Sequence, residues 1–399
     1  MTIPNVYIIN LSFGLAGTER RMANVWQALR ARGNVRPILV VPEPLAEVLI
    51  QRNIVERGDD ALWTVPDSGW LRTVGRVRTF ARANDFLAYA RARVVAGHFE
   101  PVWERIRQDP HAVVHIGLDS SSLNPPDVPI VYECMDSTLV RLGGRHYIKA
   151  AARRSVINCQ TERIRVALEA RLAHLRPMWT TVTSPNYFAS YPPEDGVMPA
   201  RDPMLFAFVG RLIPEKNPLT FLDAIAQLRA SGLPARGLIL GFGTLLTEMQ
   251  RRIGQLGLTD VIEIAHTPNP GPRLREASVF VSLQTGDNYG SQSLLEAMGA
   301  GCAVVASDVG DTSRLVTPAV GRLTGFSTAE VAAALGALAV DPRGTAIMGA
   351  AASDLVRTNY TADGYAEFLE SLYTLAIDRL QSADATNLPS PHLPQALAK

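Results

Sequence analysis

The second half of the chain contains the segment Phe208-Val-Gly-Arg-Leu-Ile-Pro-Glu-Lys-Asn-Pro218, in which an apolar run ends in a glycine and two cations follow. The apolar residues predict a buried strand, and a helix is expected to begin near Pro218, because proline fits the first turn of a helix. Arg211 and Lys216 then lie at the carboxyl end of a parallel strand, where open α/β sheets bind ligands. Together they suit a diphosphate, since Arg offers a two-pronged donor and Lys a point charge. The alternative is that both are solvated surface cations beside a loop.

Short apolar runs rich in Val and Ile alternate with helical patterns along the whole chain. Continuous apolar strands that alternate with helices are typical of parallel sheets covered on both faces. Two sets of such runs predict an α/β protein with two Rossmann-like domains. The first set is Val6–Ile9, Pro37–Val41, Val113–Ile116, Ile130–Tyr132, Val156–Asn158 and Thr181–Ser184, and the second is Leu205–Val209, Leu238–Leu240, Val261–Ile264, Val279–Leu283 and Ala303–Ala306.

A segment rich in Pro and charged residues separates the two sets and breaks every periodicity, as a linker does. Near the C-terminus a helix with one apolar side is predicted from Asp363 to Leu380, with Asp363 as its N-cap. The predicted division is a first domain 1–190, a linker 191–203, a second domain 204–356, a C-terminal helical region 357–380 and a loose tail 381–399.

The composition excludes several classes of protein. Hydrophobic residues make up 47% of the chain and charged residues 19%, the reverse of what disorder requires. A formal net charge of +1 gives no global argument for nucleic-acid binding. Three scattered cysteines are too few for a disulfide framework or a zinc cluster, and no other cluster has metal-ligand spacing. The N-terminus lacks the pattern of a signal peptide and no apolar stretch approaches about 18 residues, so we expect a cytoplasmic protein.

A second polar loop follows a later strand and reads Gln284-Thr-Gly-Asp-Asn-Tyr-Gly-Ser-Gln-Ser-Leu-Leu-Glu296. A helix is predicted to start near Ser291, and its free backbone N–H groups make an anion site. Glu296, about one turn inside, could accept two vicinal hydroxyls, as on a ribose. The alternative is a capping or first-turn acid that the helix dipole stabilises.

Together the two segments resemble the retaining GT-B glycosyltransferases of family 4 (glycosyl transferases group 1). The family pattern is a strand, Gly-Arg-Leu, three residues and Lys, followed later by a Glu-x7-Glu motif and Ala-Met; Gly241-Phe-Gly243 also resembles the family's Gly-x-Gly. The resemblance covers most of the second domain. It implies two Rossmann-like domains that face a cleft, with a C-terminal helix that crosses back to the first domain.

The resemblance also implies roles for individual residues. Arg211 and Lys216 would hold the donor diphosphate, Glu296 the ribose, and the backbone around Tyr289–Ser293 the donor phosphate and sugar. Thr267 would line the base, and His266 beside it either lines the base or has no role. The implied catalytic residues are Arg211, Lys216 and Asp136, and the implied substrate-binding residues are Gly17, Asp287, Asn288, Tyr289, Gly290, Ser291, Glu296 and Thr267.

The sequence departs from the family pattern at three positions. Asn288 stands where the first Glu of Glu-x7-Glu would be, and Asp287 one residue earlier could take its place. Ala16 replaces one glycine of the usual Gly-Gly-x-Glu, so that Gly17 alone lets backbone approach the donor phosphate or the acceptor. Met135 stands where a histidine is expected near the sugar.

Candidates to replace that histidine lie on either side of it. Asp136 follows Met135 directly, and Glu133 either substitutes for the histidine or is a surface acid at a strand end. His115, on the preceding strand, is more often a satisfied core histidine than a catalytic one.

The predicted function is a retaining hexosyltransferase of class EC 2.4. It would move a sugar from a nucleotide diphosphate sugar, UDP rather than GDP, to an acceptor hydroxyl in surface polysaccharide or glycolipid assembly. No cofactor or metal and no nucleic-acid partner is expected. The arginine-rich segment 70–93 has three interpretations. It is a peripheral contact with the inner face of an anionic membrane, an ordinary solvated helix face, or a set of arginines that line a pocket for an anionic acceptor. The alternative function is a non-catalytic nucleotide-sugar or glycan-binding protein that acts as a partner or scaffold.

Overall fold

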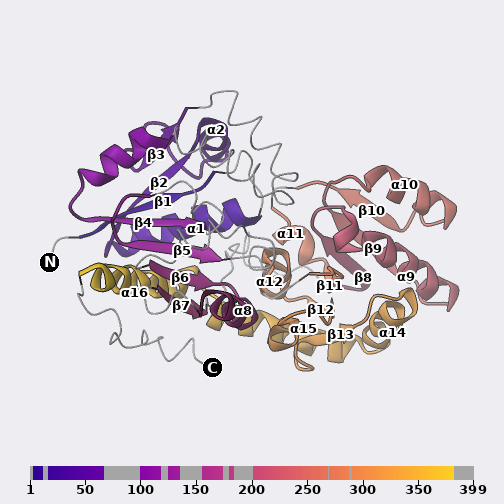
Figure 1. Cartoon of the computed structure of the whole chain (residues 1–399). Helices are drawn as coiled ribbons and strands as arrows, with labels where there is room; N and C mark the ends of the chain where they lie inside the picture. Colours follow the sequence, from indigo (N-terminus) through magenta and orange to yellow (C-terminus); the bar gives the residue numbers. More distant parts are fainter. Residues whose placement is uncertain are drawn as a thin grey trace. The chain divides into compact units, whose positions relative to one another are not determined.

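A computed structural model describes most of the chain, and it divides into two compact units. The first unit comprises Met1–Asn186 and Ala362–Lys399, and the second comprises Tyr187–Thr361. Each unit is an α/β layer structure built on its own parallel sheet (Figure 1). The described residues are 3–11, 17–66, 99–117, 125–134, 155–173, 179–183, 201–267, 269–286 and 290–381.

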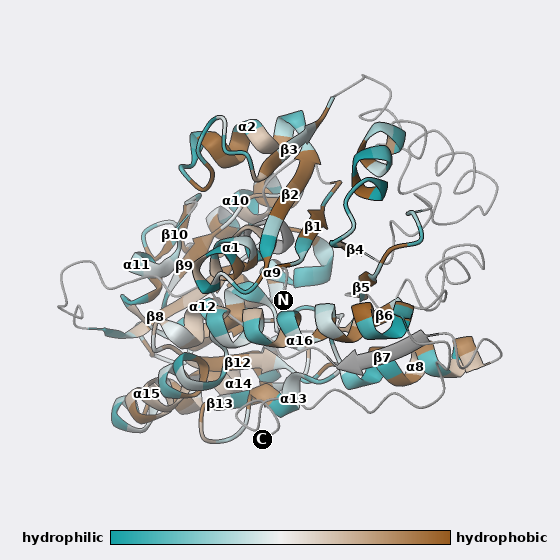
Figure 2. Cartoon of the chain, turned by 90° about the vertical axis from the view of Figure 1, so that its left-hand side faces the viewer, coloured by the Kyte–Doolittle hydropathy of each residue, from teal (hydrophilic) through white to brown (hydrophobic). Residues whose placement is uncertain are grey.

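The first unit contains a seven-stranded sheet in the order β3-β2-β1-β4-β5-β6-β7, and every neighbouring pair is parallel. The chain builds outward from β1 in one direction and then from β4 in the other, so the order reverses between β1 and β4. Figure 2 shows that β1 and β2 are hydrophobic along most of their length, as strands buried on both faces are. The strands are β1 Asn5–Ile9, β2 Arg36–Pro42, β3 Leu62–Val65, β4 Ala112–Gly117, β5 Ile130–Cys134, β6 Ser155–Cys159 and β7 Trp179–Thr183.

Helices cover both faces of this sheet. On one face, apolar strand residues such as Ile116 and Tyr132 pack with Trp103 and with the helix α8 (Glu162–Leu172). On the other face lie the helices α1 and α16, which also pack against each other. α16, yellow in Figure 1, comes from the end of the chain and lies against β4, β5 and β6. The helices of the unit with both ends described are α1 Gly17–Arg32, α2 Glu43–Gln51, α8 Glu162–Leu172 and α16 Ala362–Gln381, and residues 99–107 are also helical.

The second unit contains a six-stranded parallel sheet in the order β10-β9-β8-β11-β12-β13, with its reversal between β8 and β11. One apolar core packs α9, α10 and α14 on one face, and a second core packs α12 and α15 on the other. The strands are β8 Asp202–Val209, β9 Arg236–Leu240, β10 Ile262–Ala265, β11 Ala277–Ser282, β12 Ala303–Ser307 and β13 Gly321–Thr324. The helices are α9 Pro218–Ala230, α10 Leu246–Gln255, α11 Gly271–Leu274, α12 Gln292–Gly299, α13 Thr312–Leu315, α14 Thr328–Ala339 and α15 Pro342–Asn359, and a 3₁₀ turn spans Pro214–Lys216.

Each strand predicted from an apolar run is present, and the α/β class with two Rossmann-like sheets is confirmed. Two strands were not predicted, β3 and β13. Both are four-residue strands at a sheet edge, and β13, with the sequence Gly-Arg-Leu-Thr, is fully buried only at its two ends. Neither of these two strands has the continuous apolar run on which the prediction depends.

The prediction that Asp363 caps the last helix is wrong. α16 begins one residue earlier, at Ala362, so Asp363 lies inside its first turn, where an acid is still favoured by the helix dipole. The acid also pairs with Arg32 at the C-terminal end of α1, with an N–O distance of 2.9 Å. The predicted linker and the predicted tail lie almost entirely outside the described residues.

Among the described residues, no single helix is both long and apolar enough to cross a membrane. A bent pair, Thr328–Ala339 with Pro342–Gln381, meets the length and composition test only when taken together.

Candidate functional site

The reversal point of the second sheet brings together the loops that follow β8 and β11. Lys216, which follows β8, hydrogen-bonds through its Nζ to Oε1 of Gln284, which follows β11. The backbone N–H of Thr285 donates to the carbonyl of Glu215 at 2.9 Å, and Nδ2 of Asn217 donates to the carbonyl of Leu283 at 2.8 Å. Three links of different kinds therefore fix Lys216 at the carboxyl edge of the sheet, the place where open α/β sheets bind ligands.

The two glycines of Gly241-Phe-Gly243 explain how a third strand end fits against this loop. A side chain at Gly241 would overlap the carbonyl oxygen of Gly210, and one at Gly243 would overlap that of Leu212. Only glycine allows the backbone after β9 to pack so closely on the loop after β8. The backbone of Gly210 itself, with φ of 153°, is in a region that L side chains rarely adopt. The loop that holds Arg211 and Lys216 is thus built for close backbone packing.

Among the described residues, no carboxylate forms an ion pair with the cations of this loop. Lys216 is half-buried and Arg211 is exposed. Burial, and then the positive charge of Arg211, lower the pKa of Lys216 from 10.5 to about 8. A dianionic group bound between the two cations would offset the positive charge of Arg211 and so stabilise the ammonium form of Lys216. The site is therefore suited to an anion of high charge density.

The helix α12 begins beside this loop, and Ser291 is its N-cap, as predicted. The hydroxyl of Ser291 lies 3.2 Å from that of Ser293 and accepts no capping bond from the helix backbone. Gly290, just before it, is buried and has φ of 71°. The first turn of α12 contains no acidic side chain.

Glu296 is the fifth residue of α12, with 3% of its surface exposed. The alternative that it is a first-turn or capping acid is therefore wrong. Its carboxylate is buried near the start of α12, and most of the other side chains of this helix are apolar.

An exposed aromatic pair lies on the far side of the cation loop, at the ends of β9 and β10. Phe242 is 60% exposed, although most residues of its size and kind in the described chain are buried. Its ring centroid is 5.0 Å from that of His266, with the rings nearly perpendicular. The hydroxyl of Thr267 donates to the carbonyl of Asn269 at 3.0 Å and so closes a local turn. His266 thus has an aromatic partner, while the hydroxyl of Thr267 is engaged within its own loop.

Phe242 was missed by the sequence reasoning, which read Gly241-Phe-Gly243 only for its glycines. A signal was available: a large aromatic residue between two glycines at a strand end has no helix or strand face on which to be buried.

In the first unit, the reading of Glu133 as a surface acid is wrong. Its Oε1 atom accepts hydrogen bonds from Nε2 of His115 and from Nδ2 of Asn158, each at 3.0 Å. His115 is 6% exposed, and its Nδ1 lies 2.7 Å from the hydroxyl of Tyr373. Both ring nitrogens of His115 are thus paired, which confirms the prediction of a satisfied core histidine.

Several predicted site residues lie outside the described residues. Gly17 is described only as the first residue of α1. Asp287 and Asn288 lie outside the described residues, so the choice between them stays a prediction. Met135, Asp136, Tyr289 and the arginine-rich segment 70–93 also lie outside.

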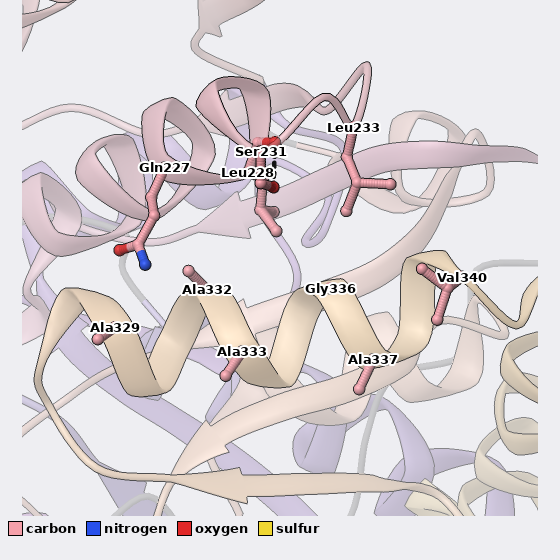
Figure 3. Close-up of a pocket in the computed structure, with 10 residues that line it drawn as sticks. All are labelled: Gln227, Leu228, Ser231, Leu233, Ala329, Ala332, Ala333, Gly336, Ala337 and Val340. Carbon is pink, nitrogen blue, oxygen red and sulfur yellow. Dashed lines mark hydrogen bonds between the residues drawn. The ribbon is translucent and has the colours of Figure 1, made fainter.

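A cavity of about 370 Å³ lies between α9 and α14, well away from the cations. Figure 3 shows alanines of α14 opposite Gln227 and Leu228 of α9 and Ser231, the residue that follows α9. Gln227 is the lining residue nearest in sequence to the cation loop. It lies nine residues after Pro218, the first residue of α9, or about 14 Å along the helix. The cavity contains no charged side chain and does not contribute to the phosphate site. In the described part of the chain, no group of three or more His, Cys, Asp or Glu could hold a metal ion.

Comparison with known proteins finds a family model that matches part of the second unit. Residues 203–341, which include the cation loop, the aromatic pair and α12, match the family model of glycosyl transferases group 1. No curated protein matches the chain in sequence.

Solved structures match over nearly the whole chain, although their sequences have diverged. HepE of Anabaena, solved with UDP and glucose, has a TM-score of 0.66 at 15% identity and covers 92% of this chain and 98% of its own. TarM of S. aureus, solved as a G117R mutant with fondaparinux, alpha-GlcNAc-glycerol and UDP, has a TM-score of 0.67 at 10% identity and covers 95% and 100%. Sucrose-phosphate synthase of Thermosynechococcus elongatus has a TM-score of 0.67 at 13% identity and covers 93% and 98%. The chain therefore has the GT-B fold, and its residues 203–341 match the glycosyl transferases group 1 model.

Proposed function

We propose that the protein is a retaining glycosyltransferase that moves a hexose from a UDP-sugar to an acceptor hydroxyl. The observation that carries the proposal is the pair Arg211 and Lys216 at the reversal point of a group 1 glycosyltransferase domain. UDP is preferred over GDP because HepE and TarM, which share the fold, were solved with UDP.

In this proposal the protein acts mainly on the leaving group. As the bond from the anomeric carbon to the diphosphate breaks, negative charge grows on the diphosphate oxygens. Arg211, Lys216 and the N–H groups at the start of α12 are donors already in place to stabilise that charge. Because these groups suffice to neutralise the leaving diphosphate, the proposal requires no metal or other cofactor.

The same proposal assigns the remaining donor contacts. Glu296 accepts the ribose hydroxyls, and Thr267 contributes the backbone of the loop that follows β10. The exposed face of Phe242, with His266 beside it, is available to stack on the base. Asp287 or Asn288 recognises the donor sugar together with Tyr289, Gly290 and Ser291, while Gly17 and Asp136 contribute from the first unit.

The first unit would provide the acceptor site. Surface polysaccharide or glycolipid assembly at the inner face of the membrane is the proposed setting, with segment 70–93 as the contact with anionic lipid. Vesicles containing anionic lipid should bind the protein at low salt and release it at high salt, because such contacts are screened. No binding at low salt would exclude this part of the proposal.

The function is tested by hydrolysis of a panel of UDP-, GDP-, ADP- and dTDP-sugars, followed by mass spectrometry, with Lys216→Ala as the control. Release of UDP from one sugar by the wild type, lost in the variant, is the expected result. Release of a different nucleotide diphosphate would change the proposed donor nucleotide but would still support the proposed enzymatic activity.

The second candidate is a non-catalytic protein that binds a nucleotide sugar or glycan as a partner or scaffold. Met135, Ala16 and Asn288, each a departure from the group 1 pattern, favour it. Binding of a nucleotide sugar without release, even with mixed glycan and lipid acceptors present, would support this candidate and contradict the enzyme.

A further inference from the structure

The first unit contains a cluster of buried and half-buried polar side chains that the proposed chemistry does not use. We call it the Glu133 cluster, and Glu133 is at its centre. The Oε1 atom of Glu133 accepts from His115 on β4 and Asn158 on β6, each at 3.0 Å, and from the hydroxyl of Tyr365 on α16 at 3.3 Å. One carboxylate oxygen thus ties two neighbouring strands and the C-terminal helix to β5. The members of the cluster are Arg21, His115, Glu133, Asn158, Tyr365 and Tyr373.

The cluster extends to α1 through Arg21, which is 5% exposed. The guanidinium carbon of Arg21 lies 4.8 Å from the centre of the Tyr365 ring. Burial tends to raise the pKa of Glu133, but the hydrogen bond and charge of His115 and the charge of Arg21 outweigh it and lower the pKa to about 2. The carboxylate is therefore ionised in the folded protein at any physiological pH.

Parallel strands are usually stabilised by apolar residues on both faces rather than by such a cluster. The neighbouring strand residues on the opposite face, among them Ile116, Tyr132 and Ile157, form an ordinary apolar core. Replacing buried ionic groups by well-packed apolar ones is often neutral or stabilising, because each buried ion loses several kcal/mol of hydration. The cluster therefore suggests a role other than adding stability.

The position of the cluster indicates what that role is. Glu133 is the last residue but one of β5, and Arg21 is the fifth residue of α1, which begins after the carboxyl end of β1. The cluster thus lies directly beneath the carboxyl edge of the sheet, near the point between β1 and β4 where the strand order reverses. Ligands of open α/β sheets bind at that edge.

We propose that Glu133 is a positioning residue, which through Tyr365 and Arg21 fixes the start of α1 and α16 against the carboxyl edge of the first sheet. The role rests on the proposed function, since the edge matters for turnover only if the protein transfers or hydrolyses a sugar donor. In this proposal Glu133 acts through Tyr365 and Arg21 and makes no contact of its own with the substrate.

The chain offers a matched control for this proposal. Glu370, also on α16, pairs with Arg32 at 2.9 Å and with Asn34 at 3.0 Å, so it ties α16 to the opposite, C-terminal end of α1. Glu133→Gln and Glu370→Gln each neutralise one carboxylate that connects α16 to the rest of the unit. They differ in the end of α1 that they affect.

The test compares these variants in the full-length protein with Tyr365→Phe, which removes one hydroxyl from the cluster. Because small displacements of positioned groups cost one to two orders of magnitude in rate, we expect Glu133→Gln to lower kcat for donor hydrolysis about ten- to a hundredfold. The KM for the donor should change much less than kcat, because most of the donor contacts assigned above lie in the second unit. Tyr365→Phe should lower kcat less, and Glu370→Gln should leave it unchanged while lowering the melting temperature. An equal fall in kcat for Glu133→Gln and Glu370→Gln, or no fall for either, would overturn the proposal.

Hydrogen–deuterium exchange makes the test independent of activity. Glu133→Gln should speed exchange of the amides of residues 17–22, and Glu370→Gln should speed it only near Arg32. Equal exchange at the start of α1 in the two variants would overturn the positioning role even if the wild type turns over no donor. If Glu133→Gln does not fold, Tyr365→Phe against Glu370→Gln decides the same question. Absence of turnover in the wild type would contradict the proposed function, and the exchange result would still stand.

Discussion

The reversal points of the two sheets use charge in opposite ways. In the second sheet, Lys216 and Arg211 lie at the carboxyl edge with no carboxylate among their described contacts, and repulsion between them contributes to the lowered pKa of Lys216. In the first sheet, Arg21 is buried and Glu133 half-buried beneath the edge, where His115, Asn158 and Tyr365 surround the carboxylate. The first arrangement leaves charge available for a ligand, while the second uses its charge within the protein.

This difference explains why equally polar strand ends need not be equally suited to binding. A cation whose pKa is lowered in the free protein gains from an anionic ligand, because the ligand restores the charged form. A carboxylate that already accepts three hydrogen bonds gains nothing comparable. An ionic ligand is therefore expected at the second reversal point, and a structural or positioning role at the first.

The largest effect should come from removing the charge at the second reversal point. Lys216→Ala should lower donor turnover about a hundredfold or more, the usual cost of losing a preorganised charge contact with the transition state. Its partner Gln284 is also left without the ammonium group. The measurement is release of nucleotide diphosphate followed by mass spectrometry. Turnover within about twofold of the wild type would remove the diphosphate assignment, since a lost charge contact costs far more.

The aromatic pair beside the cations should have a smaller effect that depends on the base. Phe242→Ala should weaken UDP binding about tenfold, because stacking of a base on an aromatic ring contributes about 1–3 kcal/mol. Binding of inorganic pyrophosphate, which has no base, should be unchanged, and Lys216→Ala should weaken both ligands. Calorimetric titration of the two ligands into the two variants checks this. Equal weakening of pyrophosphate by Phe242→Ala would show that Phe242 supports the loop rather than the base.

The pH dependence of binding separates the charge of Lys216 from its shape. Since the pKa of Lys216 in the free protein is lowered to about 8, the ammonium form that a diphosphate needs is lost as the pH rises through 8. The affinity for UDP should thus fall about fivefold between pH 8 and pH 9, and the slope should approach one decade per unit at higher pH. Lys216→Arg should bind with little change over this range, because an arginine keeps its charge. An equally steep fall in the Lys216→Arg variant would assign the titration to another group.

The sequence predicted the parts of this picture that depend on local pattern. The apolar strands, the cation loop and the start of α12 at Ser291 all follow from runs and spacings within a few residues. The Glu133 cluster could not be predicted in this way, because Glu133 and Tyr365 are 232 residues apart and His115 and Tyr373 are 258 apart. Sequence pattern gives the face of a strand, but it does not show which distant helix will cover that face. Phe242 was missed for a different reason, since its exposure depends on two glycines packing against a neighbouring loop.

The smallest expected effect tests the internal use of charge in the first unit. Because the pKa of Glu133 is about 2 in the folded protein and 4.5 ordinarily, its carboxylate contributes stability above pH 4.5 that is lost as the pH falls from 4.5 towards 2. Glu133→Gln lacks this titration, so the difference in urea midpoint between wild type and variant should shrink as the pH falls through that window. Lys216→Ala is a suitable control, because its side chain does not titrate there and its difference from the wild type should be constant with pH. A difference for Glu133→Gln that stays constant as well would mean that the carboxylate is not held in its charged form by the cluster, and the contrast between the two reversal points would then be one of burial alone.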